Sequence, residues 1–171
     1  RDVPEDVLRK AAERGTMIHS ICELVDDMGI THDSDEAQGY KELKDDWELR
    51  YECSEYLVSD NEHYASCIDK VYRENETDFT LGDIKTTYVL DKESVRWQLS
   101  IYAYFFELQN PGCNAVRLIG IWLRGKNHEI VEVERIPSEV VMNLLKCDSE
   151  GRQFVNPYSI SPVTLPDEYR K

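Results

Sequence analysis

The stretch "SCIDKVYRENETDFTLGDIKTT" (66–87) decides how this chain folds. Both of its ends are rich in β-branched, aromatic and aliphatic residues, and the polar run between them is typical of a tight turn, so it predicts two neighbouring strands. Side chains two residues apart share one face of a strand, which places Asp83 and Lys85 on the same side. Charges are costly to bury, so Asp69 in the first strand and this pair in the second call for more than a packing role.

Outward from this stretch, the hydrophobic period predicts the order helix, three strands, helix, two strands, helix. Apolar spacing between Pro4 and Gly29 predicts one long helix, or two short ones broken near Gly15. We expect the strands at 51–59, 63–73, 79–89, 115–125 and 128–136, the last two as a hairpin, and the remaining helices at 91–110 and 137–151. Ser138 is the expected N-cap of the last helix. The pattern predicts an α/β protein with a central mixed sheet flanked by helices.

Two segments lie outside this order. Residues 31–49 are polar and acidic, and we expect a mobile insertion there, with one helical patch around 40–49. Residues 152–171 are rich in Pro and Tyr and are expected to form an extended tail. With 171 residues the chain fits a single domain, 1–171, that can bury a sizeable core.

The charge balance limits how this protein could bind nucleic acid. Against 34 acidic residues the chain has 20 basic ones, for a formal net charge of −14, which argues against electrostatic binding over the whole surface. A local basic track beside a carboxylate-rich metal site is still compatible with this balance. The basic residues available to line one groove on DNA are Arg14, Lys70, Arg73, Lys92, Arg96, Arg124 and Lys126.

The cysteine pattern and hydropathy indicate the expected compartment. Five cysteines are widely spaced, odd in number and contain no CxxC, which favours neither a zinc knuckle nor a regular disulfide framework. No run of eighteen or more apolar residues is present, so we expect no membrane helix. These features are typical of a protein of the reducing cytoplasm.

Asp69 and Asp83 can converge on one cation if their strands are neighbours. Two carboxylates and a backbone carbonyl are suitable ligands for Mg²⁺ or Mn²⁺, which keep waters in their other positions. Lys85 could orient or deprotonate such a water for attack on phosphorus. The alternative is a structural salt bridge between Lys85 and either aspartate.

These residues also carry a family resemblance. The elements "SCIDKVY", "GDIKTT" and "WQLSIYAY", preceded by "RGTMIHSICE", resemble the PD-(D/E)XK nuclease superfamily, and in particular its RecB-like branch. The resemblance implies a restriction-endonuclease-like core in the order αβββαβ, with an extra strand and a C-terminal helix added here. Ile68 stands where the superfamily has its proline.

The resemblance also implies roles for individual residues. Asp69, Asp83, His19 and the backbone carbonyl of Ile84 would hold Mg²⁺ or Mn²⁺, and Lys85 would act on the attacking water. Gln98 and Tyr102 match the QxxxY element of the branch and would share one face of a helix. Iron–sulfur members carry clustered cysteines near the C-terminus, where this chain has Cys147 alone, so no iron–sulfur cluster is expected.

Simpler interpretations exist for several of these residues. His19, near Ile18 and Ile21, could be a partly buried structural histidine, and Gln98 and Tyr102 could pack the helix onto the sheet. Glu23, Glu52 and Glu55 are further carboxylates that could share the site or be solvated acids.

Taken together, these features predict a metal-dependent DNA nuclease, an exonuclease of recombination, repair or end processing in a bacterial cell or a phage-infected host. DNA ends or single strands are the expected substrates. A recombinase or single-strand-binding protein is a possible partner, an oligomer is possible, and no membrane partner is expected. The alternative is a catalytically silent nuclease-like module that binds or scaffolds a recombination complex, which the negative charge favours.

Overall fold

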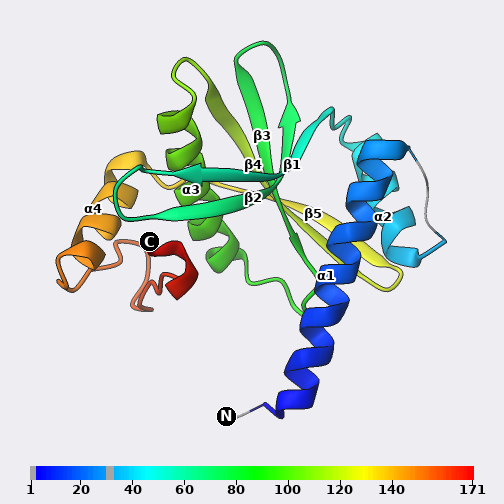
Figure 1. Cartoon of the computed structure of the whole chain (residues 1–171), viewed down its shortest axis with the longest axis horizontal. Coiled ribbons are helices and arrows are strands. Elements are labelled where there is room, and N and C mark those ends of the chain that lie inside the picture. Colours follow the sequence, from blue (N-terminus) through cyan, green and yellow to red (C-terminus); the bar gives the residue numbers. More distant parts are fainter. Residues whose placement is uncertain (1–2, 30–32) are drawn as a thin grey trace.

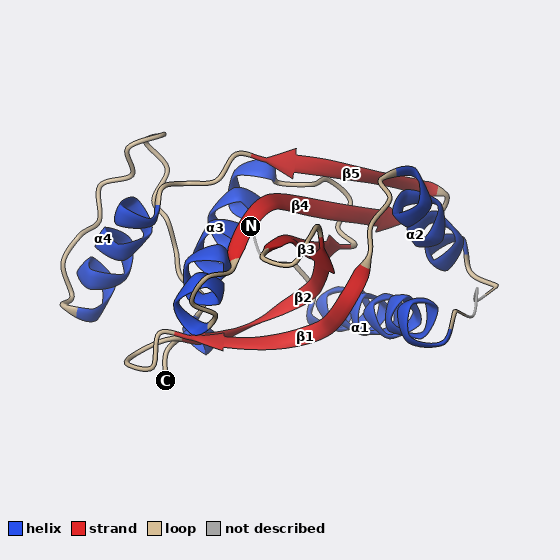
Figure 2. Cartoon of the chain, turned by 90° about the horizontal axis from the view of Figure 1, so that it is seen from above, coloured by secondary structure: helices blue, strands red, loops and turns tan. Residues whose placement is uncertain are grey.

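The computed structural model describes residues 3–29 and 33–171 and shows a five-stranded mixed sheet with helices packed against it (Figures 1 and 2). In chain order the elements are α1 (Glu5–Met28), α2 (Asp35–Asp46), β1 (Tyr51–Ser59), β2 (Ala65–Arg73), β3 (Asp78–Lys85), α3 (Lys92–Gln109), β4 (Asn114–Arg124), β5 (Asn127–Val133), α4 (Ser138–Ser149) and a short 3₁₀ helix, Asp167–Tyr169. The predicted α/β class and mixed sheet are confirmed. None of these helices is both long and apolar enough to cross a bilayer.

The strands lie in sequence order, β1-β2-β3-β4-β5. Every neighbouring pair is antiparallel except β3 and β4, which are parallel because α3 carries the chain back across the sheet. The pairing of β2 with β3 ends at Lys70 and Gly82. The next residue on each strand, Asp69 and Asp83, therefore lies where the two strands begin to separate.

The core consists of two hydrophobic clusters on opposite faces of the sheet. On one face, Val71 and Leu81 pack with the buried residues of α3. On the other, Tyr72 and Ile84 pack with the buried residues of α1 and α2. Successive residues of β2 thus serve different clusters, as the two-residue period of a strand requires.

Helix α1 is continuous through Gly15, so the alternative of a break at this residue is wrong. A Cβ atom at Gly15 would lie 3.3 Å from Thr86 Oγ1, which shows how closely the helix passes the end of β3. The helix ends at Gly29, whose φ of 65° suits glycine and whose N–H donates to the Val25 carbonyl.

The expectation of a mobile segment at 31–49 is wrong for residues 33–49, whereas an insertion there stays a prediction; residues 31 and 32 lie outside the described residues. Ser34 caps α2 by accepting a hydrogen bond from the Ala37 N–H, and Tyr40 and Leu43 are buried in the core. One apolar face is enough to dock a helix whose other faces are acidic.

Two expectations near the C-terminus also need correction. Helix α4 begins at Ser138 itself, after Pro137, and no side chain caps it; the Ser138 hydroxyl instead accepts a hydrogen bond from Arg135. The segment 152–171 has little regular structure, but it folds back onto the core, where Leu165 and Tyr169 are buried.

Candidate active site

A cleft of about 500 Å³ opens where β2 and β3 separate. The predicted site residues that line this cleft come from four separate elements, α1, β2, β3 and α3. They are His19, Asp69, Asp83, Ile84, Lys85, Gln98 and Tyr102.

The two aspartates face each other across this separation. Asp69 Oδ2 accepts hydrogen bonds from the Ile84 N–H at 2.8 Å and from His19 Nε2 at 3.1 Å. Asp83 is 2% exposed, and its Oδ1 accepts a hydrogen bond of 3.3 Å from Gln98 Nε2. The Lys85 ammonium lies 3.0 Å from Asp83 Oδ2 and is the ionic partner of this buried oxygen. Within the described part of the chain, that oxygen accepts no hydrogen bond beyond this ion pair.

Burial and mutual repulsion distinguish the two carboxyl groups. Burial, followed by the negative charge of Asp69, raises the pKa of Asp83 to about 7. Burial also opposes ionisation of Asp69, but the hydrogen bond and charge of His19 hold its pKa below the usual value. The pair therefore carries less than two negative charges near neutral pH, and an added positive charge would favour full ionisation.

His19 is oriented by hydrogen bonds to both of its ring nitrogens. Nδ1 lies 2.8 Å from the Gly15 carbonyl, so this nitrogen carries a proton, and Nε2 is directed at Asp69. The hydrogen bond to Asp69 outweighs burial and raises the pKa of His19 to about 9. Near neutral pH both ring nitrogens of His19 therefore carry a proton, and Nε2 would have to lose its proton before it could bind a cation in the cleft.

Helix α3 supplies a second set of hydrogen bonds. Gln98 Nε2 donates both to Asp83 and to the Tyr102 hydroxyl, the latter at 2.8 Å. The Tyr169 hydroxyl donates in turn to that of Tyr102 at 3.1 Å. Gln98 and Tyr102, four residues apart on one helical face, thus hold Asp83 in place.

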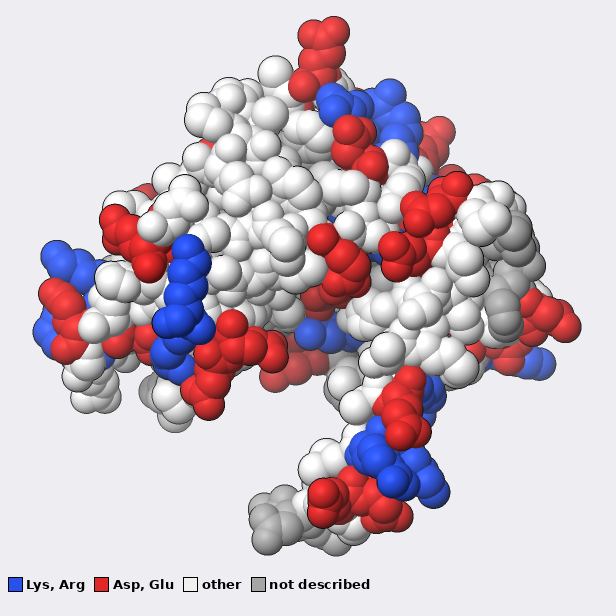
Figure 3. Space-filling view, viewed as in Figure 1, with Lys and Arg blue, Asp and Glu red and all other residues white. Residues whose placement is uncertain are grey.

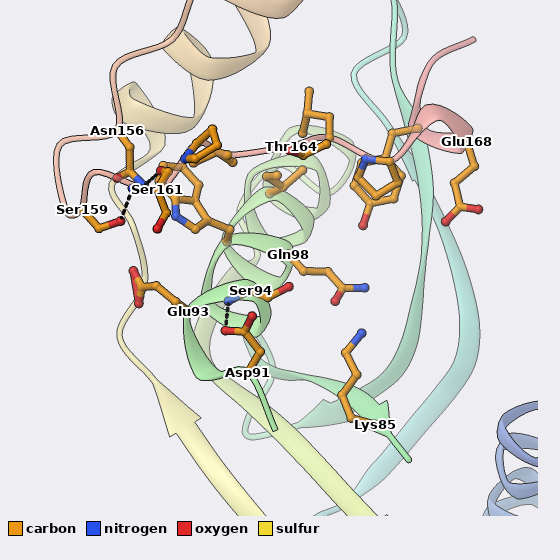
Figure 4. A pocket seen from close by; sticks show the side chains of 17 residues that line it. Lys85, Asp91, Glu93, Ser94, Gln98, Asn156, Ser159, Ser161, Thr164 and Glu168 are labelled. Atoms are coloured by element: carbon orange, nitrogen blue, oxygen red, sulfur yellow. Dashed lines mark hydrogen bonds between the residues drawn. The ribbon is translucent and has the colours of Figure 1, made fainter. Parts of the chain in front are cut away.

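Sequence reasoning missed the contribution of the C-terminal segment. Glu168 and Tyr169 line the cleft, and a cavity of about 570 Å³ continues from it between α3 and residues 156–169. Figure 4 shows Lys85 and Gln98 extending toward this cavity, with Glu168 across it. No local pattern links Glu168 to β3, because only the folding back of the chain brings them together.

The remaining carboxylates lie elsewhere. Glu23 is exposed on α1, and Glu52 forms an ion pair with Arg73. Glu55 accepts a hydrogen bond from the Cys67 thiol but does not itself line the cleft.

Most of the predicted DNA-binding set is also dispersed. Lys70 is 2% exposed and paired with Asp26, so its predicted contact with DNA is wrong. Arg73 pairs with Glu52, and Arg96 donates to the Glu134 carbonyl. Arg14 and Arg124 do lie near the cleft, since both donate hydrogen bonds to the Thr86 carbonyl, next to Lys85.

The donors of the cleft fit a hard divalent cation, although no three His, Cys, Asp or Glu side chains of the described chain lie at metal-binding spacing. The N–H and C=O of a strand residue point to the same side, so the Ile84 carbonyl faces Asp69 as its N–H does. Mg²⁺ is often held by one or two carboxylates and several waters. Asp83 Oδ2, which accepts no hydrogen bond beyond its ion pair with Lys85 in the described part of the chain, is an atom that such a cation could bind.

No protein-family model matches the chain, and no curated protein is similar to it. A solved structure described as "Crystal structure of SSO0001" is similar in fold, with a TM-score of 0.50 and 14% sequence identity. The similarity covers 85% of this chain and 62% of that protein, so the chain spans about three fifths of its length. At this identity the likeness concerns the fold alone.

Proposed function

We propose that this protein is a metal-dependent DNA nuclease with a restriction-endonuclease-like core. The observation that carries the proposal is that Asp69 and Asp83 face each other where β2 and β3 separate, with Asp83 buried beside the Lys85 ammonium. A structural salt bridge needs one carboxylate beside Lys85, whereas here two buried carboxyl groups meet at an open cleft. The resemblance to RecB-like nucleases supports the same roles for Asp69, Asp83 and Lys85.

Asp69, Asp83 and the Ile84 carbonyl are the groups that would hold Mg²⁺ or Mn²⁺, and His19 Nε2 would join them on giving up the proton that it shares with Asp69. When bound, the cation would polarise the phosphodiester and make water a stronger nucleophile at neutral pH. Burial favours the neutral amine of Lys85, but the charge and hydrogen-bonding capacity of Asp83 raise its pKa above the usual value. Lys85 thus acts in our proposal as an ammonium that binds the phosphate and orients water, rather than as a proton acceptor.

The surrounding residues act on the carboxylates. His19 and the Ile84 N–H fix one oxygen of Asp69, and Gln98 fixes one oxygen of Asp83. Tyr102 restrains Gln98. Preorganised donors of this kind keep the acids in place during reaction, so no reorganisation is needed when substrate binds.

DNA is the proposed substrate, and exonucleolytic digestion in the cytoplasm is the proposed mode and place of action. A second candidate is a silent module that binds DNA or a recombination partner without cutting it. The net charge of −14 favours this second candidate, because a general affinity for DNA requires positive charge.

The test is a cleavage assay on linear and circular, single- and double-stranded DNA with Mn²⁺, Mg²⁺ or EDTA. We expect Asp83→Asn and Lys85→Ala each to reduce cleavage by roughly 10²-fold or more, since each removes a charged group from the reacting centre. Glu23→Gln, on the exposed side of α1, is the matched control and should cleave as the wild type does. Cleavage that survives in both variants or in EDTA would contradict the proposal, and binding without cleavage would favour the second candidate.

A further inference from the structure

A groove of about 460 Å³ runs between the first half of α1 and the loop that follows β3. Its lining contains three basic side chains and no acidic one. The lining residues are Val7, Lys10, Ala11, Arg14, Thr86, Thr87, Tyr88 and Arg124. Such a lining is unusual for a protein with a net charge of −14, and Figure 3 shows acidic groups in several separate clusters on the face in view. The groove therefore favours an anionic ligand.

The basic groups of the groove are available for a ligand. No ion pair within the described chain involves Lys10, Arg14 or Arg124, whereas Arg73 and Arg135 are paired with acids. Arg14 Nη2 and Arg124 Nη1 both donate to the Thr86 carbonyl, at 3.2 and 2.9 Å. The two guanidinium groups thus converge on one oxygen. Each has five N–H donors, so most of these donors remain available to bind a ligand.

Tyr88 adds an aromatic surface to this groove. Its side chain is 80% exposed, and the Arg124 guanidinium lies 5.5 Å from the centre of its ring. The loop beneath is held in place, because the Thr87 carbonyl accepts a hydrogen bond of 2.7 Å from Trp122 Nε1. An exposed aromatic ring beside cationic groups is the arrangement on which unpaired bases stack.

The groove and the cleft share no lining residue, but they adjoin each other along β3 and α1. Lys85 of the cleft is followed in the chain by Thr86 and Thr87 of the groove. On α1, Arg14 precedes His19 by five residues, a rise of about 7.5 Å along the helix axis. A chain of phosphates that left the groove at this end would therefore be close to the cleft.

We infer that this groove binds single-stranded DNA as it enters the cleft, with Lys10, Arg14 and Arg124 on phosphates and Tyr88 stacked on an unpaired base. The identification of the ligand as DNA rests on the proposed function. The exposed ring favours a single strand over a duplex, because the bases of a duplex are already stacked on each other.

The test is the fluorescence anisotropy of a labelled single-stranded oligonucleotide in EDTA, with the full chain, over a range of salt concentrations. We expect the double variant Arg14→Ala/Arg124→Ala to raise the Kd about 10- to 100-fold at low salt. Its log–log salt slope should fall by about 1.4, because each phosphate contact on a single strand contributes about 0.7. Lys146→Ala/Arg152→Ala removes two basic groups outside the groove and should leave both quantities unchanged.

Tyr88→Ala should raise the Kd about 5- to 100-fold without changing the salt slope, and Tyr88→Phe should restore binding, since stacking needs only the ring. A duplex of the same length should bind more weakly and be insensitive to Tyr88→Ala.

Equal Kd values for the groove and control double variants would overturn the inference, as would binding of polyglutamate or duplex as tight as that of the single strand. If the wild type cuts DNA but the groove variants bind the oligonucleotide normally, the inference about the groove is wrong and the proposed nuclease function stands. If binding depends on the groove but no DNA is cut, the proposed nuclease function is wrong and the groove still binds single strands.

Discussion

Asp69 and Lys70 are consecutive residues of β2, yet they belong to two ionic clusters on opposite faces of the sheet. Lys70 belongs to the anchor cluster, Asp26, Tyr40, Lys44, Lys70 and Tyr72, between the sheet and helices α1 and α2. Asp69 belongs to the site cluster, His19, Asp69, Asp83, Lys85 and Gln98, which lines the cleft.

The two clusters are both buried but differ in how their charges are paired. In the anchor cluster, Asp26 Oδ2 lies 2.7 Å from Lys70 Nζ and accepts a hydrogen bond of 2.6 Å from Tyr40, while Oδ1 pairs with Lys44. In the site cluster two carboxyl groups repel each other, although His19 pairs with one and Lys85 with the other. Burial of charge therefore does not identify a site; two like charges buried together beside a cleft are the informative feature.

The largest expected effect tests the anchor cluster. Asp26→Asn should lower the free energy of unfolding by about 3–5 kcal/mol, because it leaves the Lys70 ammonium buried without its counterion. Urea denaturation measures this loss, and Glu23→Gln on the same helix should stay within about 0.5 kcal/mol of wild type. A loss of under about 1 kcal/mol would show that the anchor cluster is not what holds α1 on the sheet.

The next effect tests the site cluster. Asp83→Asn should lower the free energy of unfolding far less than Asp26→Asn does, because burial and the charge of Asp69 already oppose the ionised form of Asp83 in the folded protein. Mn²⁺ at 100 times its Kd should stabilise wild type by about 2.7 kcal/mol. For a chain of this size that is a rise in melting temperature of roughly 5–10 °C.

The Asp83→Asn variant is the control for the cation and should show no such rise in a thermal melt. An equal rise in wild type and variant would mean that the cation binds elsewhere. A strong loss of stability in the variant without Mn²⁺ would instead assign Asp83 the anchoring role of Asp26.

The smallest effect concerns the support of the site by α3. Tyr102→Phe should lower the free energy of unfolding by about 1 kcal/mol, because the hydroxyl bonds both Gln98 and Tyr169. Tyr104→Phe is the control, because Tyr104 lies two residues further on, toward the other side of the same helix, and no hydrogen bond of its hydroxyl is found in the described part of the chain. Equal stability of the two variants would show that the Tyr102 hydroxyl is dispensable.

Much of the fold could be predicted because its signals are local. The strand and helix periods around Asp69, Asp83 and Gln98 placed these residues on the correct elements, and a two-residue period put Lys85 on the face of Asp83. The prediction that Lys70 contacts DNA is wrong because the local sequence does not show whether a helix covers that face of the strand. The prediction that residues 33–49 are mobile is wrong because helix α2, although mostly acidic, has a narrow apolar stripe that includes Tyr40.

Backbone periods of two and 3.6 residues can be recognised along the chain, so the sequence alone predicts most of the elements and which side chains share a face. Which charges meet depends on the packing of those elements. Asp26 meets Lys70, and Asp83 meets Asp69, because strands and helices distant in sequence come together at those points. For the same reason, the tertiary structure alone brought Glu168 to the cleft and Arg14 beside Arg124 in the groove.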